Sequence, residues 1–383
     1  MSDGAKVCFV VNHVAFFASH RLPLATRLRD YGYQPHLVTG RAGNEQMERE
    51  GELRCDVARV PRERACFSAD GLNPVIEMIG MVQLALKLRR IRPEVVHCAS
   101  PKGNLYGAIA AQATSARIIV LAISGMGFGY TNSSQGSAKR KFVRIIQSAI
   151  QKIALRSPKI RVIVQNTEDE EIIQRNYPWL VDKIYRIPGS GVDLDAFRHS
   201  QTIQRDRNVV FAGRLLEDKG LFEFIEAAQI LKVKYPTWKF VVAGAAGYRN
   251  PSAVSAEYMN LPSVAQSVEW LGHVEDMPEL LLRSSMVCSP SYREGMPKIL
   301  LEAAAAGCAV VTTAVAGCEE AVVPNKTAIV VPARDSARLA TAIESLINDR
   351  QKMFELGQNG RLLAEERYSL EKVVQAVRDI YQS

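Results

Sequence analysis

The chain has 383 residues, of which 47% are hydrophobic and 23% charged, so it is long enough for two or three folded domains and too apolar to be disordered. Its formal net charge is +8, and the excess lies in residues 1–200, where 28 Lys and Arg face 18 Asp and Glu. The seven cysteines are scattered without a C-x2-C pair, and no apolar run approaches about 20 residues, which excludes a zinc ribbon and argues against a disulfide framework and a membrane span.

Short apolar runs alternate with longer helical periods in the first half of the chain. The run at 6–11 lacks the features of a signal peptide and predicts the first strand, and further strands are expected at 35–40, 94–100, 117–124, 161–166 and 183–189. Helices are expected at 21–31, 75–91 and 138–156. Runs that are apolar on both faces and separated by helices are typical of a parallel sheet covered on both sides.

The same alternation restarts after a polar segment at 193–207. Strands are expected at 208–214, 239–244, 268–273, 286–291, 309–313 and 328–333, and helices at 220–234, 336–348 and 351–382. The sequence therefore predicts an α/β fold of two doubly wound, Rossmann-like domains that face each other across a cleft. We expect the domains at 1–192 and 208–365, a linker at 193–207, and a C-terminal helix at 366–383 that returns to the first domain.

Basic residues occur without acidic ones between Glu94 and Glu168. This pattern indicates an anionic partner, which could be nucleic acid, a phosphorylated substrate or an anionic membrane, although solubilising charges would look the same. Segment 137–156 also spaces its apolar residues as a helix does, and a buried helix would show the same stripe. We expect a cytoplasmic protein, held at the inner face of the cell membrane by the basic residues Lys139, Arg140, Lys141 and Arg144.

A basic loop follows the first strand of the second domain. Gly213 would let the backbone approach a ligand closely, and Arg214 and Lys219 supply a bidentate fork and a point charge beside a helix start. Together they predict a diphosphate site. A basic surface turn is the alternative.

Two carboxylates eight residues apart follow a later strand. Glu294 lies in a loop with Gly295, Met296 and Pro297, and a helix is expected to start at about Pro297 and to end before Gly307. Glu302 lies inside that otherwise apolar helix, where a carboxylate needs a partner such as a hydroxyl-rich ligand. An exposed helical glutamate is the alternative.

The pair Glu294-x7-Glu302, the loop Gly213-Arg214-x4-Lys219-Gly220 and the double α/β layout resemble the retaining glycosyltransferases of family 4, which have the GT-B fold. The segments NH-x6-HR (12–21), SPKGNLYG (100–107), SGMGF (124–128) and AGAAGYRNPS (243–252) are similar to the bacterial branch that extends undecaprenyl-diphosphate-linked sugars. The resemblance covers essentially the whole chain. It implies transfer of a hexose, with N-acetylhexosamine favoured, from a UDP-sugar in glycan or polysaccharide biosynthesis.

The resemblance also implies roles for the donor-side residues. Arg214 and Lys219 would bind the donor diphosphate in place of a metal, so neither a metal nor another cofactor is expected. Glu302 would hold the ribose, Glu294 and the backbone of 295–297 would hold the donor sugar, and Gly244, His273 and Val274 would flank the nucleotide. Transfer would proceed by front-face attack, with the leaving phosphate accepting the proton of the acceptor.

The first domain would bind a lipid-linked diphosphate saccharide as acceptor. We expect His13, His20, Lys102 and Gly125 to contribute, although a lone histidine is more often a structural hydrogen-bonding group. The glycine pair that is usual after the first strand is replaced here by Asn12-His13, a departure from the family pattern.

Three other functions stay open on the sequence alone. A transferase of this family could use a soluble acceptor, and a protein of this fold could be catalytically silent, although the intact Glu294/Glu302 and Arg214/Lys219 pairs argue against silence. A nucleotide- or nucleic-acid-binding module would also explain the basic half. It is disfavoured because the first strand is followed by no G-x-G-x-x-G, so no nucleic-acid partner is expected.

Overall fold

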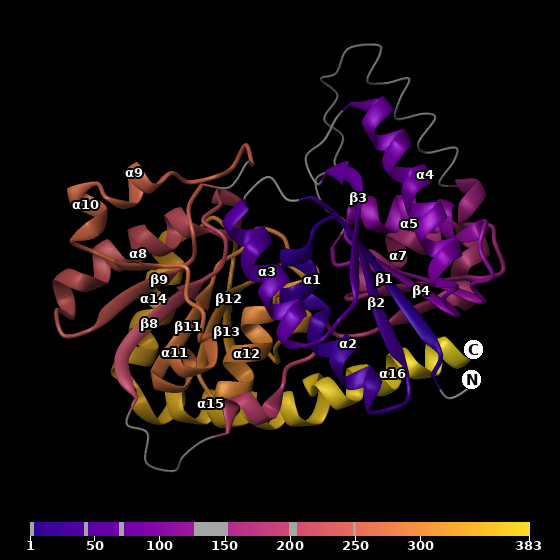
Figure 1. The fold of residues 1–383 in the computed structure, drawn as a ribbon. Helices are drawn as coiled ribbons and strands as arrows, with labels where there is room; N and C mark the ends of the chain where they lie inside the picture. The colour runs from indigo at the N-terminus through magenta and orange to yellow at the C-terminus, as the bar shows by residue number, and fades with distance from the viewer. Residues whose placement is uncertain (1–3, 42–44, 69–72, 126–151, 199–204, 248–249) are drawn as a thin grey trace. The chain divides into compact units, whose positions relative to one another are not determined.

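A computed structural model describes residues 4–41, 45–68, 73–125, 152–198, 205–247 and 250–383 of the chain (Figure 1). The chain divides into two compact units: unit 1 contains Met1–Ser190 and Glu371–Ser383, and unit 2 contains Gly191–Leu370. None of the helices within the described residues combines the length and the apolar character needed to cross a membrane.

Unit 1 is built on a parallel sheet. Within the described residues its seven strands follow the order β3-β2-β1-β4-β5-β6-β7, so the direction of winding reverses between β1 and β4. Strands β4 and β5 are buried at every position, as expected for strands with helices on both sides. The strands are β1 (Lys6–Val11), β2 (Gln34–Arg41), β3 (Arg62–Ser68), β4 (Val95–Ala99), β5 (Ile118–Ala122), β6 (Ile160–Val164) and β7 (Ile184–Arg186).

Helices flank this sheet, and the last helix of the chain joins them. Tyr381 of that helix is fully buried in unit 1, where its hydroxyl lies 2.7 Å from Nδ1 of His97 and its ring meets the ring of Tyr33 edge-on. The final residues therefore complete the core of the first unit. The helices are α1 (Val14–His20), α2 (Leu22–Arg29), α3 (Glu45–Val57), α4 (Pro74–Ile91), α5 (Pro101–Gln112), α7 (Thr167–Asn176), the 3-10 helix η1 (Pro178–Lys183) and α16 (Leu370–Gln382).

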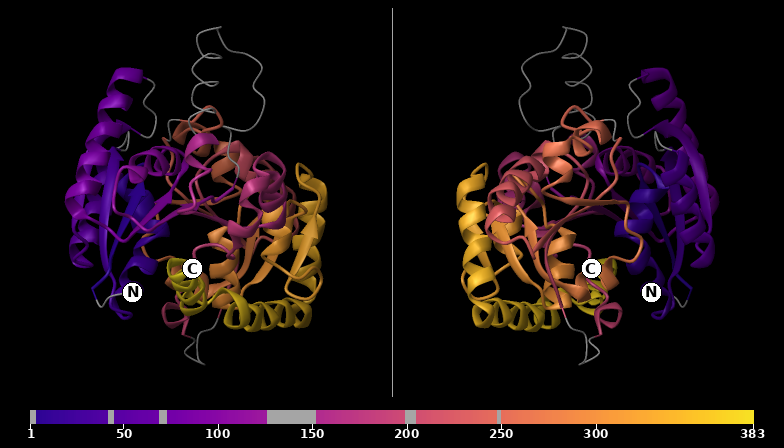
Figure 2. Two further views of the ribbon diagram at one scale, coloured as in Figure 1. Left: turned by 90° about the vertical axis from the view of Figure 1, so that its right-hand side faces the viewer. Right: turned by 90° about the vertical axis from the view of Figure 1, so that its left-hand side faces the viewer.

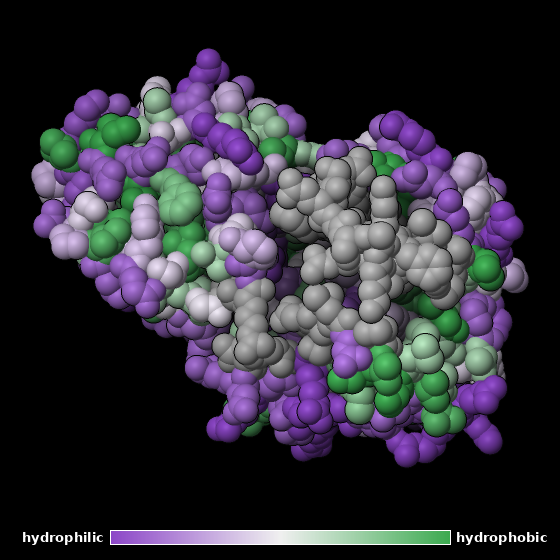
Figure 3. Space-filling view, turned by 90° about the horizontal axis from the view of Figure 1, so that it is seen from above, coloured by the Kyte–Doolittle hydropathy of each residue, from purple (hydrophilic) through white to green (hydrophobic). Residues whose placement is uncertain are grey.

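Helix α4 differs from the other helices of unit 1 in its surface. Gly80, Leu84 and Leu88 are buried on its inner side, while a row of large apolar side chains on the outer side is exposed. Figure 3 shows apolar residues gathered over this part of the molecule, at the lower right.

Unit 2 repeats the architecture with a six-stranded parallel sheet in the order β10-β9-β8-β11-β12-β13. Neighbouring strand residues belong to different core clusters: Val209 and Phe211 pack with α8 and α14, whereas Val210 packs with α11 and α12. Both faces of the sheet are thus covered by helices, as Figure 2 shows from two sides. The strands are β8 (Asp206–Ala212), β9 (Lys239–Ala243), β10 (Glu269–Gly272), β11 (Ser284–Ser289), β12 (Ala309–Thr313) and β13 (Ala328–Val331).

The helices of unit 2 include several of a single turn. They are η2 (Leu194–Phe197), η3 (Glu217–Lys219), α8 (Leu221–Lys234), α9 (Ala256–Met259), α10 (Pro262–Ala265), α11 (Met277–Arg283), α12 (Lys298–Ala306), α13 (Ala316–Glu320), α14 (Ser336–Asn348), α15 (Arg350–Leu363) and the π-helical turn η4 (Ala364–Tyr368).

The predicted fold class of two doubly wound, Rossmann-like domains is confirmed by the two sheets. Strand β3 was not expected from the sequence, and the predicted helix at 138–156 lies mostly outside the described residues. Pro297 differs slightly from its predicted place, since it is the N-cap of α12 and Lys298 is the first helical residue. Gly307 ends α12 at φ 68°, the left-handed backbone that glycine adopts without strain.

Candidate functional site

The loops after β8, β9 and β10 meet at the carboxyl edge of the unit 2 sheet. The amide of Gly213 donates to the carbonyl of Ala243 at 2.9 Å, and the amide of Gly244 donates to the carbonyl of Gly272 at 2.7 Å. A Cβ on Gly244 would lie 1.9 Å from the oxygen of Gly213, so this glycine is required by the neighbouring loop. A Cβ on Gly213, in contrast, would meet no atom within 4 Å, which leaves its outer side open to a ligand.

Lys219 and Glu294 meet at the carboxyl end of β11. Nζ of Lys219 lies 2.5 Å from Oε1 of Glu294, and the two side chains are only 19% and 15% exposed. The hydroxyl of Ser291 donates to the same carboxylate oxygen at 2.9 Å, and the hydroxyl of Thr313 donates to the carbonyl of Ser291 at 2.5 Å. Strands β8 and β11 are neighbours at which the winding of this sheet reverses, and ligands of open α/β sheets bind at that point.

Close backbone packing holds the two loops of this pair together. Gly220 has φ +73°, and a Cβ there would lie 2.1 Å from the carbonyl oxygen of Pro290. The amide of Tyr292 donates to the carbonyl of Asp218 at 2.9 Å. On the other side, a Cβ on Gly317 would lie 2.3 Å from the oxygen of Gly295. The loop around Glu294 is therefore fixed from both sides by glycines.

Glu302 is also paired. Its carboxylate lies 2.5 Å from Nζ of Lys298, one helical turn earlier in α12, and the Glu302 side chain is 11% exposed. A cation in the first turn of a helix opposes the helix dipole, so the Lys298 charge needs this carboxylate or another anion nearby. The N-cap Pro297 makes no side-chain hydrogen bond to the first amides of α12, and such amides are suited to a phosphate or sugar oxygen.

The remaining predicted donor-side residues differ in how far they are exposed to solvent. Arg214 is exposed, and among the described residues its side chain has no ion-pair partner. His273 is exposed and Val274 half-buried directly after β10. Met296 is 9% exposed and packs in the core with α12, so its side chain has a structural role.

The Cys318 thiol and the Tyr292 hydroxyl stay uncharged at neutral pH. Burial raises the pKa of the Cys318 thiol to about 12, so it is neither a thiolate nor a nucleophile at neutral pH. Burial and a hydrogen bond to Glu223 raise the pKa of Tyr292, whose ring lies 4.3 Å from the guanidinium carbon of Arg334. Charged side chains at this edge include those of Arg214, Lys219, Glu294, Lys298 and Glu302, together with Glu223 and Arg334 beside Tyr292.

In unit 1 the loops after β1 and β4 interlock at the corresponding switch point. The amide of Asn12 donates to the hydroxyl of Ser100 at 2.8 Å, and Oδ1 of Asn12 accepts from the Ser100 hydroxyl at 2.8 Å and the Gly103 amide at 3.0 Å. Ser100 has φ 71°, an unusual backbone for a residue with a side chain, and such strain is often found at functional sites. Sequence reasoning missed Ser100.

Three of the four predicted acceptor residues, His13, Lys102 and Gly125, follow shortly after β1, β4 and β5, whereas His20 is the last residue of α1. Nδ1 of His13 caps α1 by accepting from the amide of Phe16 at 3.2 Å, and the ring of His20 stacks on that of Phe16 at 4.7 Å. Nζ of Lys102 lies 3.0 Å from Glu77 of α4. Gly125 has φ +93° shortly after β5.

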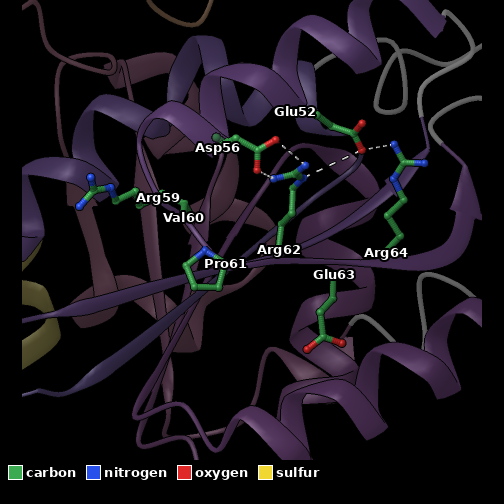
Figure 4. A pocket seen from close by; sticks show the side chains of 9 residues that line it. Glu52, Asp56, Arg59, Val60, Pro61, Arg62, Glu63 and Arg64 are labelled. Atoms are coloured by element: carbon green, nitrogen blue, oxygen red, sulfur yellow. Dashed lines mark hydrogen bonds and ion pairs between the residues drawn. The ribbon is translucent and has the colours of Figure 1, made fainter.

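A separate pocket lies between α3 and the start of β3 (Figure 4). Two of its three lining arginines are already paired with carboxylates: Arg62 with Asp56 and Glu52, and Arg64 with Glu52. It lies at the amino end of β3, away from the carboxyl edge of the sheet where Asn12 and Ser100 meet. We therefore read it as a charged seam that covers an edge strand.

One set of predicted residues cannot be placed in the structure. Lys139, Arg140, Lys141 and Arg144 lie outside the described residues. In the part of the chain that is described, no group of three or more His, Cys, Asp and Glu side chains is arranged to hold a metal ion.

Known families match both halves of the chain. The family model "Glycosyl transferase 4-like" matches residues 6–157, and the model "Glycosyl transferases group 1" matches residues 194–363. Together these matches take in both predicted domains.

Relatives with assigned reactions align along most of the chain. The N,N'-diacetylbacillosaminyl-diphospho-undecaprenol alpha-1,3-N-acetylgalactosaminyltransferase of Campylobacter jejuni is 26% identical over 367 residues, which is 92% of either chain. The UDP-Gal:alpha-D-GlcNAc-diphosphoundecaprenol alpha-1,3-galactosyltransferase of Escherichia coli is 24% identical over 81% of this chain and 80% of its own. Among solved structures, Anabaena Alr3699/HepE in complex with UDP covers 98% of either chain with a TM-score of 0.76 at 16% identity. This likeness confirms the predicted GT-B fold.

Proposed function

Because the chain belongs to the glycosyltransferases that these two family models describe, we propose that it moves a sugar from a UDP-sugar to an undecaprenyl-diphosphate-linked saccharide, with retention at the anomeric carbon. We propose N-acetylhexosamine as the sugar, because the Campylobacter relative is named for N-acetylgalactosamine transfer. The names of both relatives support the lipid-linked acceptor.

The observation that carries the proposal is the charged pair at the β8/β11 switch point. Lys219 and Glu294 are held 2.5 Å apart on loops fixed by glycines, and the exposed Arg214 stands on the loop between β8 and Lys219. In our proposal Arg214 and Lys219 bind the diphosphate of the donor and neutralise the charge that grows on the leaving UDP. Glu294 then contacts the hydroxyls of the donor sugar, with the backbone of 295–297 beside it.

The nucleotide would lie along the same edge. Glu302 would accept hydrogen bonds from the ribose hydroxyls, and the first amides of α12 would face a phosphate or sugar oxygen. Gly244, His273 and Val274 would flank the base, because they follow the neighbouring strands β9 and β10. No metal takes part in this proposal, since two side-chain cations are available for the diphosphate.

The acceptor would bind to unit 1 at the edge where Asn12 meets Ser100. Lys102 would exchange its partner Glu77 for the acceptor diphosphate, and His13, His20 and Gly125 would contribute further contacts to the acceptor. Attack of the acceptor hydroxyl from the face that the leaving phosphate occupies would let that phosphate take the proton. This route gives retention without a second carboxylate nucleophile.

The donor is tested by thermal-shift measurements with UDP-, GDP-, dTDP- and CMP-sugars. We expect selective stabilisation by UDP-sugars, because only the bound state gains from ligand. The transfer step is then measured with a short-chain polyprenyl-diphosphate saccharide and, in parallel, with the same saccharide free in solution. If sugar is transferred only to the free saccharide, the acceptor is soluble and not lipid-linked. If no UDP compound stabilises the protein, the proposed UDP-sugar donor is wrong.

A lipid-linked acceptor would bring the enzyme to the inner face of the membrane. The basic residues Lys139, Arg140, Lys141 and Arg144 are proposed to contribute through attraction to anionic headgroups, worth about 1 kcal/mol for each charge near the surface. Co-sedimentation with anionic and neutral vesicles tests this part. Binding that is unchanged when the four residues are replaced by Glu would exclude them.

A further inference from the structure

We propose that the outer face of helix α4 is a docking surface for a lipid bilayer, into whose headgroup region its apolar side chains insert. Six large apolar side chains on this helix are between 46% and 64% exposed. They recur at helical spacing over three turns, so they form one continuous row: Val75, Ile76, Met78, Ile79, Val82 and Leu86.

The exposed row lies on the side of α4 opposite to the side that packs against unit 1. Leu84 and Leu88 on the inner side are fully buried, and a Cβ on Gly80 would lie 2.6 Å from the backbone nitrogen of Phe67 in β3. The inner face is thus closely packed without help from the outer row. Contiguous apolar surface of this kind usually marks an interaction site.

Charge along the same helix favours a bilayer. The outer face ends at Arg89 and Arg90, of which Arg90 keeps 70% of its side chain exposed while pairing with Glu63 at 2.5 Å. Glu77, the acidic residue of α4, points inward to the hydroxyl of Tyr106 at 2.6 Å. An apolar face with basic and no acidic side chains is the pattern of helices that lie in the plane of an anionic membrane.

The composition of the row argues against a protein partner. Its members are aliphatic or methionine, whereas the residues that dominate protein interfaces are Trp, Tyr and Arg. Gln83, a polar neighbour, accepts from the backbone amide of Cys66 at 3.0 Å and so already has a partner in unit 1.

The position of α4 connects the docking surface with the acceptor site, and this connection rests on the proposed function. Glu77 holds Lys102 at 3.0 Å from the inner side of α4. A bilayer on the outer side would therefore lie about one helix diameter, about 10 Å, from the ammonium proposed to meet the acceptor diphosphate. That distance suits an acceptor whose diphosphate lies at headgroup level while its polyprenyl chain stays in the bilayer.

The test compares two matched pairs of substitutions in the full chain. Val82→Ser/Leu86→Ser removes part of the row. Leu53→Ser/Val57→Ser removes a Leu and a Val on α3 that have the same spacing and are even more exposed, at 64% and 78%. Vesicles of phosphatidylcholine with and without phosphatidylglycerol, free of acceptor, are used for flotation. We expect the α4 pair to lower vesicle partition about tenfold or more, the α3 pair to leave it unchanged, and Arg89→Glu/Arg90→Glu to remove the preference for anionic vesicles.

Three results would overturn the docking surface. Equal partition of both pairs would show that the row does not insert. If substitution of α4 changes the oligomeric mass of the protein in solution, the face contacts a second copy of the chain. If the cysteine of a Leu86→Cys variant is labelled slowly before vesicles are added, other residues of the same chain cover the face. Transfer to a short-chain acceptor without vesicles is measured for each variant, so loss of the proposed reaction is seen independently of loss of docking.

Discussion

Nζ of Lys219 lies 2.5 Å from Oε1 of Glu294, although 75 residues separate them in the chain. A lysine proposed to bind a diphosphate and a glutamate proposed to bind a sugar therefore form an ion pair with each other in this structure. Binding of the donor would have to replace this ion pair by two contacts with ligand.

Lys219→Ala is expected to abolish most donor binding and transfer, because it removes a charge proposed to bind the diphosphate. It also leaves the Glu294 carboxylate, which is 15% exposed, with Ser291 as partner, so the free energy of unfolding should fall by about 1–3 kcal/mol. Calorimetric titration with UDP and thermal unfolding measure the two effects. Lys326→Ala, at an exposed position of unit 2, is the control, and wild-type transfer by the Lys219 variant would refute the diphosphate assignment.

Glu302→Gln is expected to raise the dissociation constant of UDP about 10- to 100-fold, because hydrogen bonds to a charged group contribute about 1.5–3 kcal/mol. The amide can still accept from Lys298, so the fold should be kept. Glu319→Gln, on an exposed position of the same unit, should leave UDP affinity unchanged. Unaltered affinity in the Glu302 variant would mean that the Lys298 pair is structural.

Transfer should survive removal of divalent cations. Arg214 and Lys219 are proposed to supply the positive charge that a metal would bring to the leaving diphosphate. Initial rates after dialysis against EDTA are compared with rates after Mg²⁺ or Mn²⁺ is restored. Activity that is lost with EDTA and returns with either metal would contradict the proposed mechanism.

Acid should destabilise unit 1 through His97. Burial, with Arg21 nearby, lowers the pKa of His97 well below 6.5, so the unfolded chain binds a proton that the folded chain does not. The stability is therefore present above about pH 6.5 and falls by about 1.4 kcal/mol for each pH unit below it. In thermal unfolding at several pH values, His97→Gln, which can still bond Tyr381, should show a shallower loss. An unchanged pH profile would assign the loss to other groups.

The layers of the fold could be predicted from the sequence because strands buried on both faces must be apolar along their length, as in β4 and β5. Strand β3 could not, since Arg62, Glu63 and Arg64 follow one another on it. Their charges are compensated by carboxylates of α3 and basic residues of α4, and these pairings exist only after the chain has folded.

In the candidate site, too, some contacts could be predicted from the sequence and others could not. The spacing of Glu294 and Glu302 marks the site in the sequence, and the Lys298–Glu302 pair could have been predicted from its i, i+4 spacing. The Lys219–Glu294 and Asn12–Ser100 contacts join separate loops, so they depend on the order of strands in the sheet. Which side of α4 stays uncovered likewise depends on packing, because the helix is apolar on both sides.

The burial of Tyr381 in the core of unit 1 has a consequence for synthesis on the ribosome. Residues 1–190 emerge first, yet the hydroxyl that meets His97 and the ring that meets Tyr33 belong to Tyr381, which is added only after unit 2. Unit 2 is continuous and can fold as it emerges, whereas unit 1 waits for residues 371–383 to close its core. A nascent chain arrested before α16 should therefore contain a native second unit beside an unfinished first one.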